Sequence, residues 1–151
     1  MRAASVWSTV VAVTLTACSQ DLESPSSAPA LDEGAAASAP LSFAQVSSGV
    51  LHACGVTTDN RAYCWGSGGA RLGVGVEKEV DDLYTRPVPV KTDLRFRFVT
   101  AGTYHTCGLT TDDRAYCWGY NFGAFLGDGS RTTRLTPVPV ADGRRYRQLE
   151  A

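Results

Sequence analysis

The chain has 151 residues, of which 44% are hydrophobic and 19% are charged, and its formal net charge is −1. This length suits one ordinary domain, and no apolar run reaches the roughly 18 residues that a membrane-spanning helix needs. A net charge near zero argues against a protein that holds nucleic acid by bulk electrostatics. The 15 glycines and 7 prolines, set among short apolar stretches, favour short strands and many turns over long helices.

The first 17 residues have the features of an export signal. Arg2 gives a positive start, and the mostly apolar stretch 6–17 is too short for an ordinary membrane span. The sequence Leu15-Thr16-Ala17-Cys18 then resembles the lipobox of bacterial lipoproteins, in which the cysteine is diacylated and becomes the mature N-terminus. This resemblance implies lipidation at Cys18 and a membrane anchor. Because Ser19 follows the cysteine, it also implies sorting to the outer membrane or cell surface. The alternative is a plain secretory signal with an incidental cysteine.

Residues 18–40 are expected to be a disordered tether. Of these 23 residues, 14 are Ala, Ser or Pro, and four acidic side chains face no Lys or Arg. Such a segment cannot bury enough apolar surface to offset the entropy cost of ordering it. We therefore expect residues 18–40 to hold the folded part away from a membrane.

The remainder of the chain contains an internal repeat. Residues 43–66 and 96–119 match at a constant offset of 53, and both contain Gly-x-x-His-x-Cys-Gly and Ala-Tyr-Cys-Trp-Gly. A Leu-Gly pair and a Pro-Val-Pro-Val string recur further along, and a third unit begins near Tyr146. The chain therefore divides into repeat 1 at 41–93, repeat 2 at 94–143 and the start of a third repeat at 144–151.

Each unit is predicted to contain a β-hairpin. Side chains alternate with a period of two on either side of Asp59-Asn60, which interrupts the run. An odd-numbered turn centred on Asp59 places Cys54 directly opposite Cys64. Turns of this kind often need one residue with positive φ, and Asn60 and its counterpart Asp113 suit that position.

The cysteine count agrees with this hairpin. Five cysteines are an odd number, and assigning Cys18 to the lipid leaves two in each unit at identical spacing. We therefore predict the disulfides Cys54–Cys64 and Cys107–Cys117, each stabilising the fold by about 2–3 kcal/mol. A zinc site is the alternative because His-x-Cys recurs, but one unit offers at most one His and two Cys. The prediction is accordingly no metal and no cofactor.

These motifs resemble the regulator of chromosome condensation repeat, and more closely its cysteine-containing form in bacterial secreted proteins and lipoproteins. The string that carries the resemblance is Gly-x-x-His-x-Cys-Gly-Leu-Thr, Ala-Tyr-Cys-Trp-Gly, Leu-Gly-Asp-Gly and Pro-Val-x-Val, over about residues 43–151. The resemblance implies an all-β fold in which each repeat supplies one blade of a β-propeller. The first unit departs from it at Val74, which replaces the Asp of Leu-Gly-Asp-Gly, and in an acidic insertion around residues 76–83.

Two full repeats and the start of a third make an incomplete propeller. Two blades cannot close a ring, and exposed sheet edges attract further strands. We therefore expect this chain to be a piece of a longer propeller, or several copies to assemble, so that the open blades pair with further repeats or with other copies.

The recurring side chains are interpreted as structural. Trp65 and Trp118 are expected to pack between blades or against strands, with an aromatic partner-binding face as the alternative. His52 and His105 are expected to be hydrogen-bonded strand residues, because a catalytic residue is normally needed only once. Turn positions are assigned to Gly66 and Gly119, and Asp128 is expected to cap its own loop by accepting backbone N–H bonds.

The sequence carries no phosphate-binding loop, nucleophile elbow or zinc-protease motif, and its two histidines are equivalent by repeat. We therefore predict a non-enzymatic exported lipoprotein that uses propeller repeats as a scaffold for an unknown protein partner. It would contact the membrane through its lipid anchor and would not bind nucleic acid. Recognition is expected in the loops that differ between units, at 67–71, 74–85, 120–125 and 130–135.

Three other functions are alternatives to this scaffold. One alternative is that the repeats serve as a module of a larger envelope enzyme or carbohydrate-binding protein, and another is that they form a structural spacer in the cell envelope. Guanine-nucleotide exchange follows from the family name alone and is disfavoured. An exported protein without a basic face should meet neither a small GTPase nor chromatin.

Overall fold

The computed structural model describes residues 40–76 and 83–151. The predicted signal peptide, Cys18, the predicted tether up to residue 39 and most of the acidic insertion lie outside the described residues. Within the described ranges, no helix combines the length and apolar character needed to span a bilayer.

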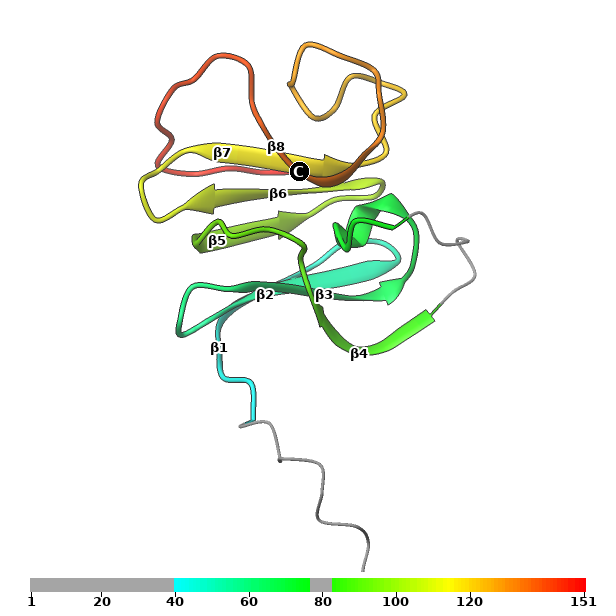
Figure 1. The fold of residues 1–151 in the computed structure, drawn as a ribbon, viewed down its shortest axis with the longest axis vertical. Helices are drawn as coiled ribbons and strands as arrows, with labels where there is room; N and C mark the ends of the chain where they lie inside the picture. The colour runs from blue at the N-terminus through cyan, green and yellow to red at the C-terminus, as the bar shows by residue number, and fades with distance from the viewer. Residues whose placement is uncertain (1–39, 77–82) are drawn as a thin grey trace, which may run out of the picture. The chain divides into compact units, whose positions relative to one another are not determined.

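Two four-stranded antiparallel sheets make up the described part of the chain, and in each the strand order follows the sequence (Figure 1). The first sheet, blade 1, contains β1 (Phe43–Ser48), β2 (His52–Thr57), β3 (Ala62–Ser67) and β4 (Leu83–Pro89). The second, blade 2, contains β5 (Phe96–Ala101), β6 (His105–Thr110), β7 (Ala115–Gly119) and β8 (Arg134–Pro139). A short 3-10 helix, η1 (Ala70–Leu72), lies between β3 and β4. The predicted all-β class is confirmed.

The hairpin register is the one that the sequence predicts. Cys54 pairs with Cys64 between β2 and β3, and Cys107 pairs with Cys117 between β6 and β7. Both turns contain the expected residue with positive φ, at 65° for Asn60 and 68° for the equivalent residue of the second turn. This conformation is accessible to Asn and Asp, whose short polar side chains tolerate the left-handed region.

The same irregularity recurs where the third strand of each blade ends. The pairing of β3 with β4 shifts between Cys64 and Gly66, and that of β7 with β8 shifts between Cys117 and Gly119. Gly66 has φ 108°, and a Cβ there would lie 2.7 Å from the His52 Cα, closer than side-chain carbons approach backbone. The fourth strands carry the Pro-Val-Pro segments, which suit an outer strand because proline donates no hydrogen bond.

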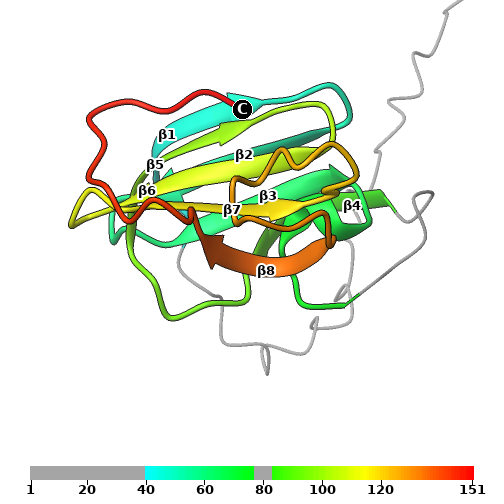
Figure 2. The same cartoon turned by 90° about the horizontal axis from the view of Figure 1, so that it is seen from above.

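The main hydrophobic core lies between the two blades, whose strands stack in corresponding order: β1 and β5 lie toward one side and β4 and β8 toward the other (Figure 2). A second, smaller cluster lies on the far face of blade 2, where Leu149 of the third unit packs against Leu126 and the second cysteine pair. The buried residues of the main core are Cys54, Val56, Ala62, Cys64, Leu72, Val90, Phe96, Val99 and Trp118. Repeat packing therefore supplies a core that neither sheet encloses by itself.

Candidate functional site

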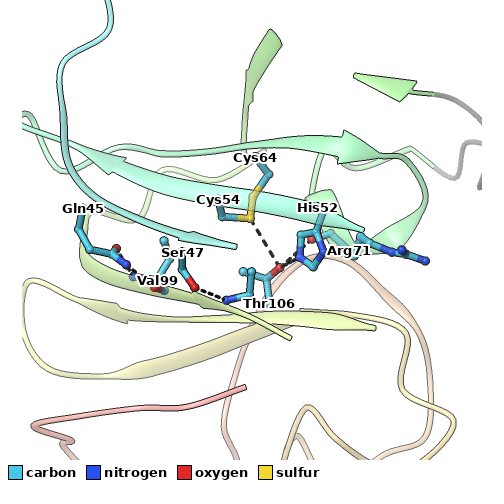
Figure 3. The surroundings of a disulfide bond; sticks show 9 residues. Gln45, Ser47, His52, Cys54, Cys64, Arg71, Val99 and Thr106 are labelled. Carbon is cyan, nitrogen blue, oxygen red and sulfur yellow. Dashed lines mark hydrogen bonds between the residues drawn. A yellow bond between two sulfur atoms is a disulfide. The ribbon is translucent and has the colours of Figure 1, made fainter. Parts of the chain in front are cut away.

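Polar side chains of β1 bond blade 1 to the backbone of blade 2 (Figure 3). The Gln45 side-chain amide donates to the Val99 carbonyl at 2.9 Å, and the Val99 amide donates back to the Gln45 Oε1 at 3.0 Å. Two residues further along each strand, the Ala101 amide donates to the Ser47 Oγ at 3.0 Å. These bonds fix the position of β5 against β1, because each backbone group finds one specific partner across the interface.

Thr106 on β6 is the centre of a second polar contact between the blades (Figure 3). Its hydroxyl donates to the Arg71 carbonyl at 2.9 Å and lies 2.7 Å from the His52 Nε2. Because the hydroxyl proton points at the Arg71 carbonyl, the His52 Nε2–H must donate to the Thr106 oxygen. The hydrogen-bond network thus assigns the Nε2–H tautomer to His52. The His52 Nδ1 is then an acceptor, and it has no hydrogen-bond partner within the described ranges.

The two equivalent histidines have different surroundings. Burial lowers the pKa of His52 to about 4, and the positive charges of Arg71 and His105 act in the same direction. His52 is therefore neutral at pH 7, as the Nε2–H tautomer requires. His105 is half-buried and stacks on Phe125, with ring planes 8° apart and centroids separated by 5.6 Å. Burial lowers the pKa of His105 as well.

Both predicted disulfides are present. The paired Cα atoms lie 4.0 Å apart in Cys54–Cys64 and 4.1 Å apart in Cys107–Cys117. The first disulfide faces blade 2 and the second lies on the far face of blade 2, so each repeat directs its sulfurs the same way. With the sulfurs bonded to each other, neither pair offers the thiolates that the zinc alternative needs. The part of the chain that the structure describes also holds no cluster of three His, Cys, Asp or Glu.

The recurring tryptophans occupy equivalent positions with different neighbours. Trp118 is fully buried between the blades beside Phe96, with ring centroids 5.8 Å apart. Gly73 approaches it so closely that a Cβ there would lie 2.6 Å from the indole nitrogen. Trp65 keeps the same aromatic partner, Phe43, with centroids 5.6 Å apart, but it is only half-buried. Because side chains alternate along β3, Trp65 lies on the face of blade 1 that points away from blade 2.

Comparison with known proteins identifies the repeat. Residues 43–70 and 96–123 match the family model of the regulator of chromosome condensation (RCC1) repeat. The chain carries two RCC1 repeats. Their matched segments run from the first strand of each blade into the loop after the third, and so include both disulfides and both tryptophans.

Proteins with similar sequences have much longer chains. The chain is 33% identical over 97 residues to the ultraviolet-B receptor UVR8 of Arabidopsis thaliana, which aligns 64% of this chain with 22% of the receptor. It is also 33% identical over 107 residues to the human E3 ubiquitin-protein ligase HERC2, aligning 69% of this chain with 2% of the ligase. The chain therefore spans less than a quarter of the length of either relative.

Solved structures share the blade arrangement. Yeast RCC1 (Prp20), in its complex with Kap60, superposes with a TM-score of 0.57 at 17% identity, over 66% of this chain and 25% of that one. Human WBSCR16 superposes with a TM-score of 0.53 at 19% identity, over 65% of this chain and 26% of that one. The two sheets are thus blades of an RCC1-type β-propeller, and the chain forms part of a propeller.

The second RCC1 repeat carries a hydrogen-bonded loop around Asp128. Its carboxylate accepts from the Ser130 amide at 2.9 Å and from the Arg134 Nε at 2.8 Å, and so it caps the loop as expected. Burial acts to raise the pKa of Asp128, but the bonds from Ser130 and Arg134 outweigh it and hold the pKa at about 2. Fully buried Asn121, which sequence analysis missed, donates to the Ser130 carbonyl at 3.0 Å and accepts from the Leu126 amide at 3.1 Å.

The proposed recognition loops do not all face solvent. The expectation for residues 67–71 is wrong, because the end of this segment is buried against blade 2. Arg71 is 3% exposed, with its guanidinium carbon 5.4 Å from the centroid of the Tyr120 ring. In the segment at 120–125 Asn121 is buried, but residues 122–125 face solvent, and Phe122 is 58% and Phe125 is 46% exposed. Residues 77–82 of the loop at 74–85 lie outside the described residues.

Proposed function

We propose that the two RCC1 repeats belong to a non-enzymatic β-propeller scaffold that binds a protein partner through loops at one end of the blades. The observation that carries this proposal is that side chains on the strands join the blades, whereas large apolar side chains in the loops are exposed. Buried side chains on the strands, such as His52, Thr106 and Trp118, join the two blades. Large apolar side chains in the loops, such as Leu51 and Phe122, are 53% and 58% exposed.

The absence of enzymatic activity is proposed from how the reactive residue types are used. His52 is neutral and enclosed between the blades, and four cysteines are bonded in pairs. The carboxylate of Asp128 is bonded to Ser130 and Arg134. Each of these groups thus has a structural partner that accounts for its position.

Export and lipid anchoring at Cys18 form the second part of the proposal. The lipobox resemblance supports it, and so do the disulfides, because stable disulfides are typical of proteins outside the cytoplasm. Metabolic labelling with a radioactive fatty acid is expected to mark the wild-type chain and not the C18S variant. Labelling that persists in C18S would contradict anchoring at this residue.

Association with a further blade is the third part of the proposal. In blade 2 the aromatic pair Phe96 and Trp118 is fully buried by blade 1, whereas the equivalent pair Phe43 and Trp65 in blade 1 is half-buried. Because the outer face of blade 1 carries the same Phe–Trp pair, we infer that a neighbouring blade packs there, either from a longer chain or from another copy.

A repeat module of a larger envelope enzyme or carbohydrate-binding protein is the second candidate. The observation that favours it is the length of the relatives, since the chain aligns with 22% of UVR8 and 2% of HERC2. Those relatives are a receptor and a ligase, so segments similar to this chain occur in longer proteins of different activity. Sequencing of the coding region around this segment distinguishes a propeller with more repeats from a chain with a catalytic domain.

The scaffold proposal is tested by site-specific photocrosslinking in cells that export the chain. Benzoylphenylalanine is placed at Phe122 and Arg131, in the loops 120–125 and 130–135, and at Gln148, an exposed position in the third unit. A discrete adduct with one protein from position 122, identified by mass spectrometry and absent from position 148, is expected. Adducts with many proteins, or none at any of the loops 120–125 and 130–135, would contradict a protein-binding scaffold.

A further inference from the structure

The β2–β3 and β6–β7 hairpin turns lie at the same end of the two blades (Figure 1). The Phe96 amide donates to the Asn60 carbonyl at 2.8 Å, which holds the β4–β5 connection beside the first turn. The Tyr146 amide donates to the Asp113 carbonyl at 2.8 Å, and so the connection after β8 lies beside the second turn. Four segments of the chain therefore bring their arginines to one surface, which we call the arginine end. These residues are Arg61, Arg95, Arg97, Arg114, Arg144, Arg145 and Arg147.

The arginine end has more positive charge than its acidic side chains neutralise. Four of its seven arginines pair with an aspartate at N–O distances of 2.7–4.0 Å. Arg95, Arg145 and Arg147 form no ion pair with any residue in the ranges 40–76 and 83–151. The expectation that the folded part has no basic face therefore does not hold at this end. The acidic side chains of the same turns and connections are Asp59, Asp93, Asp112, Asp113 and Asp142.

These arginines stay at the surface when a further blade packs beside them. Arg95 and Arg97 lie where blade 2 joins blade 1, and both side chains are exposed although both blades are present. Arg145 and Arg147 occupy the equivalent positions where a third blade would join blade 2. The arginine end is therefore distinct from the faces used in blade stacking.

The segment that leads to the proposed lipid anchor joins the fold at this end. The Thr58 amide of the β2–β3 turn donates to the Ser42 carbonyl at 2.9 Å, and β1 begins at the next residue. Leu41 lies beside the same turn and is 44% exposed. The 24 residues from 19 to 42 span at most about 85 Å even when fully extended. An anchor at Cys18 would thus keep the arginine end within reach of the membrane, where weak contacts act at a high effective concentration.

A cavity of about 210 Å³ lies at the arginine end of blade 1, between Arg61 and Arg95. Its lining holds these two arginines and one acidic side chain, Asp93. The equivalent cavity of blade 2 is only about 40 Å³, and there Arg114 and Arg145 form a β-bridge across the gap. Two guanidinium groups on either side of an open cavity are suited to a phosphate group, whose oxygens accept their parallel N–H bonds.

We propose that the arginine end docks on an anionic phospholipid surface, with a headgroup phosphate held between Arg61 and Arg95. Arginines next to a membrane are attracted by its negative surface potential, and exposed Leu41 adds apolar contact. This inference rests on the proposed anchoring at Cys18 and gives the anchored scaffold an orientation. The loops at the opposite end, where partner binding is proposed, then face away from the membrane.

Photocrosslinking to lipid measures this orientation. The lipidated, disulfide-bonded full chain is reconstituted into vesicles of phosphatidylcholine with or without phosphatidylglycerol, and benzoylphenylalanine is placed at Thr58, Thr111 or Thr103. Thr58 and Thr111 are exposed in the turns of the arginine end, and Thr103 is exposed in the β5–β6 loop at the opposite end. With phosphatidylglycerol present, phospholipid adducts measured by intact mass are expected to be at least about tenfold more frequent at positions 58 and 111 than at position 103.

Charge reversal tests whether the arginines cause this preference. The double variant R95E/R145E is expected to reduce the adducts at positions 58 and 111 at least about tenfold, because each arginine near an anionic surface strengthens binding about fivefold. The matched control is R131E, which reverses an exposed arginine before β8 at the opposite end and is expected to leave the preference unchanged. Near-UV circular dichroism confirms that each variant is folded.

Four outcomes would overturn the inference in a chain that still floats with the vesicles, so that anchoring at Cys18 stands. They are equal adducts at all three positions, the same preference in phosphatidylcholine alone, and a preference that R95E/R145E leaves unchanged. The fourth is a preference that appears only after the four acidic residues of the predicted tether are replaced by amides, which would show that the tether occupies the arginines. A wild-type chain that does not float with the vesicles would remove the anchor and the orientation together.

Discussion

Trp65 and Trp118 are the same residue in the same position of two repeats, and their environments differ because only one of them has a neighbouring blade. Trp118 is fully buried between blades 1 and 2, whereas Trp65 lies half-buried on the outer face of blade 1. His52 and His105 differ in the same way, since His52 is bonded to blade 2 through Thr106 and His105 stacks on Phe125 of its own blade. A repeated residue therefore takes its energetic role from the next repeat along the chain.

The largest expected effect tests this comparison directly with the tryptophans. Replacing Trp118 by Ala removes a fully buried side chain and leaves a cavity in the main core, so we expect a loss of about 3–5 kcal/mol in the free energy of unfolding. The same change at half-buried Trp65 is expected to cost no more than about half as much. Urea unfolding followed by circular dichroism measures both losses. Equal losses would show that burial by a neighbouring blade does not make Trp118 more stabilising than Trp65.

The second prediction concerns pH and separates the two histidines. The unfolded chain takes up a proton on His52 near pH 6.5, while the folded chain resists it until about pH 4. The stability that His52 contributes is therefore complete above pH 6.5 and is lost as the pH falls through 4, by up to about 3 kcal/mol. Unfolding curves between pH 7 and pH 4 measure this loss. The H52Q variant is expected to flatten the pH dependence more than H105Q does, and the reverse order would contradict the assignment.

Sequence alone predicts the features that lie within one repeat. The register of Cys54 with Cys64, the positive φ of Asn60 and both disulfides follow from local spacing, and the structure agrees. These features depend on residues close in the chain, where the period of a strand and the needs of a turn fix the geometry.

The polar contacts that Thr106 and Gln45 make between the repeats escape prediction because these two residues do not recur. The counterpart of Thr106 is Ala53 and that of Gln45 is Phe98, so a search for repeated residues passes over both. The expectation that the segment 67–71 is a recognition loop is wrong because its differences between the repeats are not a sign of partner binding. The segment varies between repeats because Arg71 contacts the neighbouring blade, and variation in sequence there marks an interface between blades. A mismatch on a strand between otherwise equal repeats is the signal that would have located these residues.

The third prediction tests the polar contact at Thr106. Replacing Thr106 by Val keeps the volume and removes the hydroxyl, which leaves the His52 Nε2–H and the Arg71 carbonyl without this partner. Buried polar groups without partners are costly, so we expect a loss of about 1–3 kcal/mol in the free energy of unfolding. The matched control is T103V in an exposed loop, where the change is expected to be small. A T106V variant as stable as T103V would show that the contact between blades is not stabilising.

The smallest effect compares equivalent glycines. Gly73 and Gly127 both have positive φ, 69° and 63°, so alanine is strained at either position by about 1–2 kcal/mol. At Gly73 the added Cβ also meets the Trp118 indole at 2.6 Å, whereas at Gly127 the nearest atom belongs to the Val140 side chain at 3.3 Å. Because only the first glycine faces a neighbouring blade, G73A is expected to lose about 1–2 kcal/mol more than G127A in urea unfolding. If G127A lost as much stability as G73A, backbone strain would account for both losses. The close approach of Gly73 to Trp118 would then contribute nothing measurable.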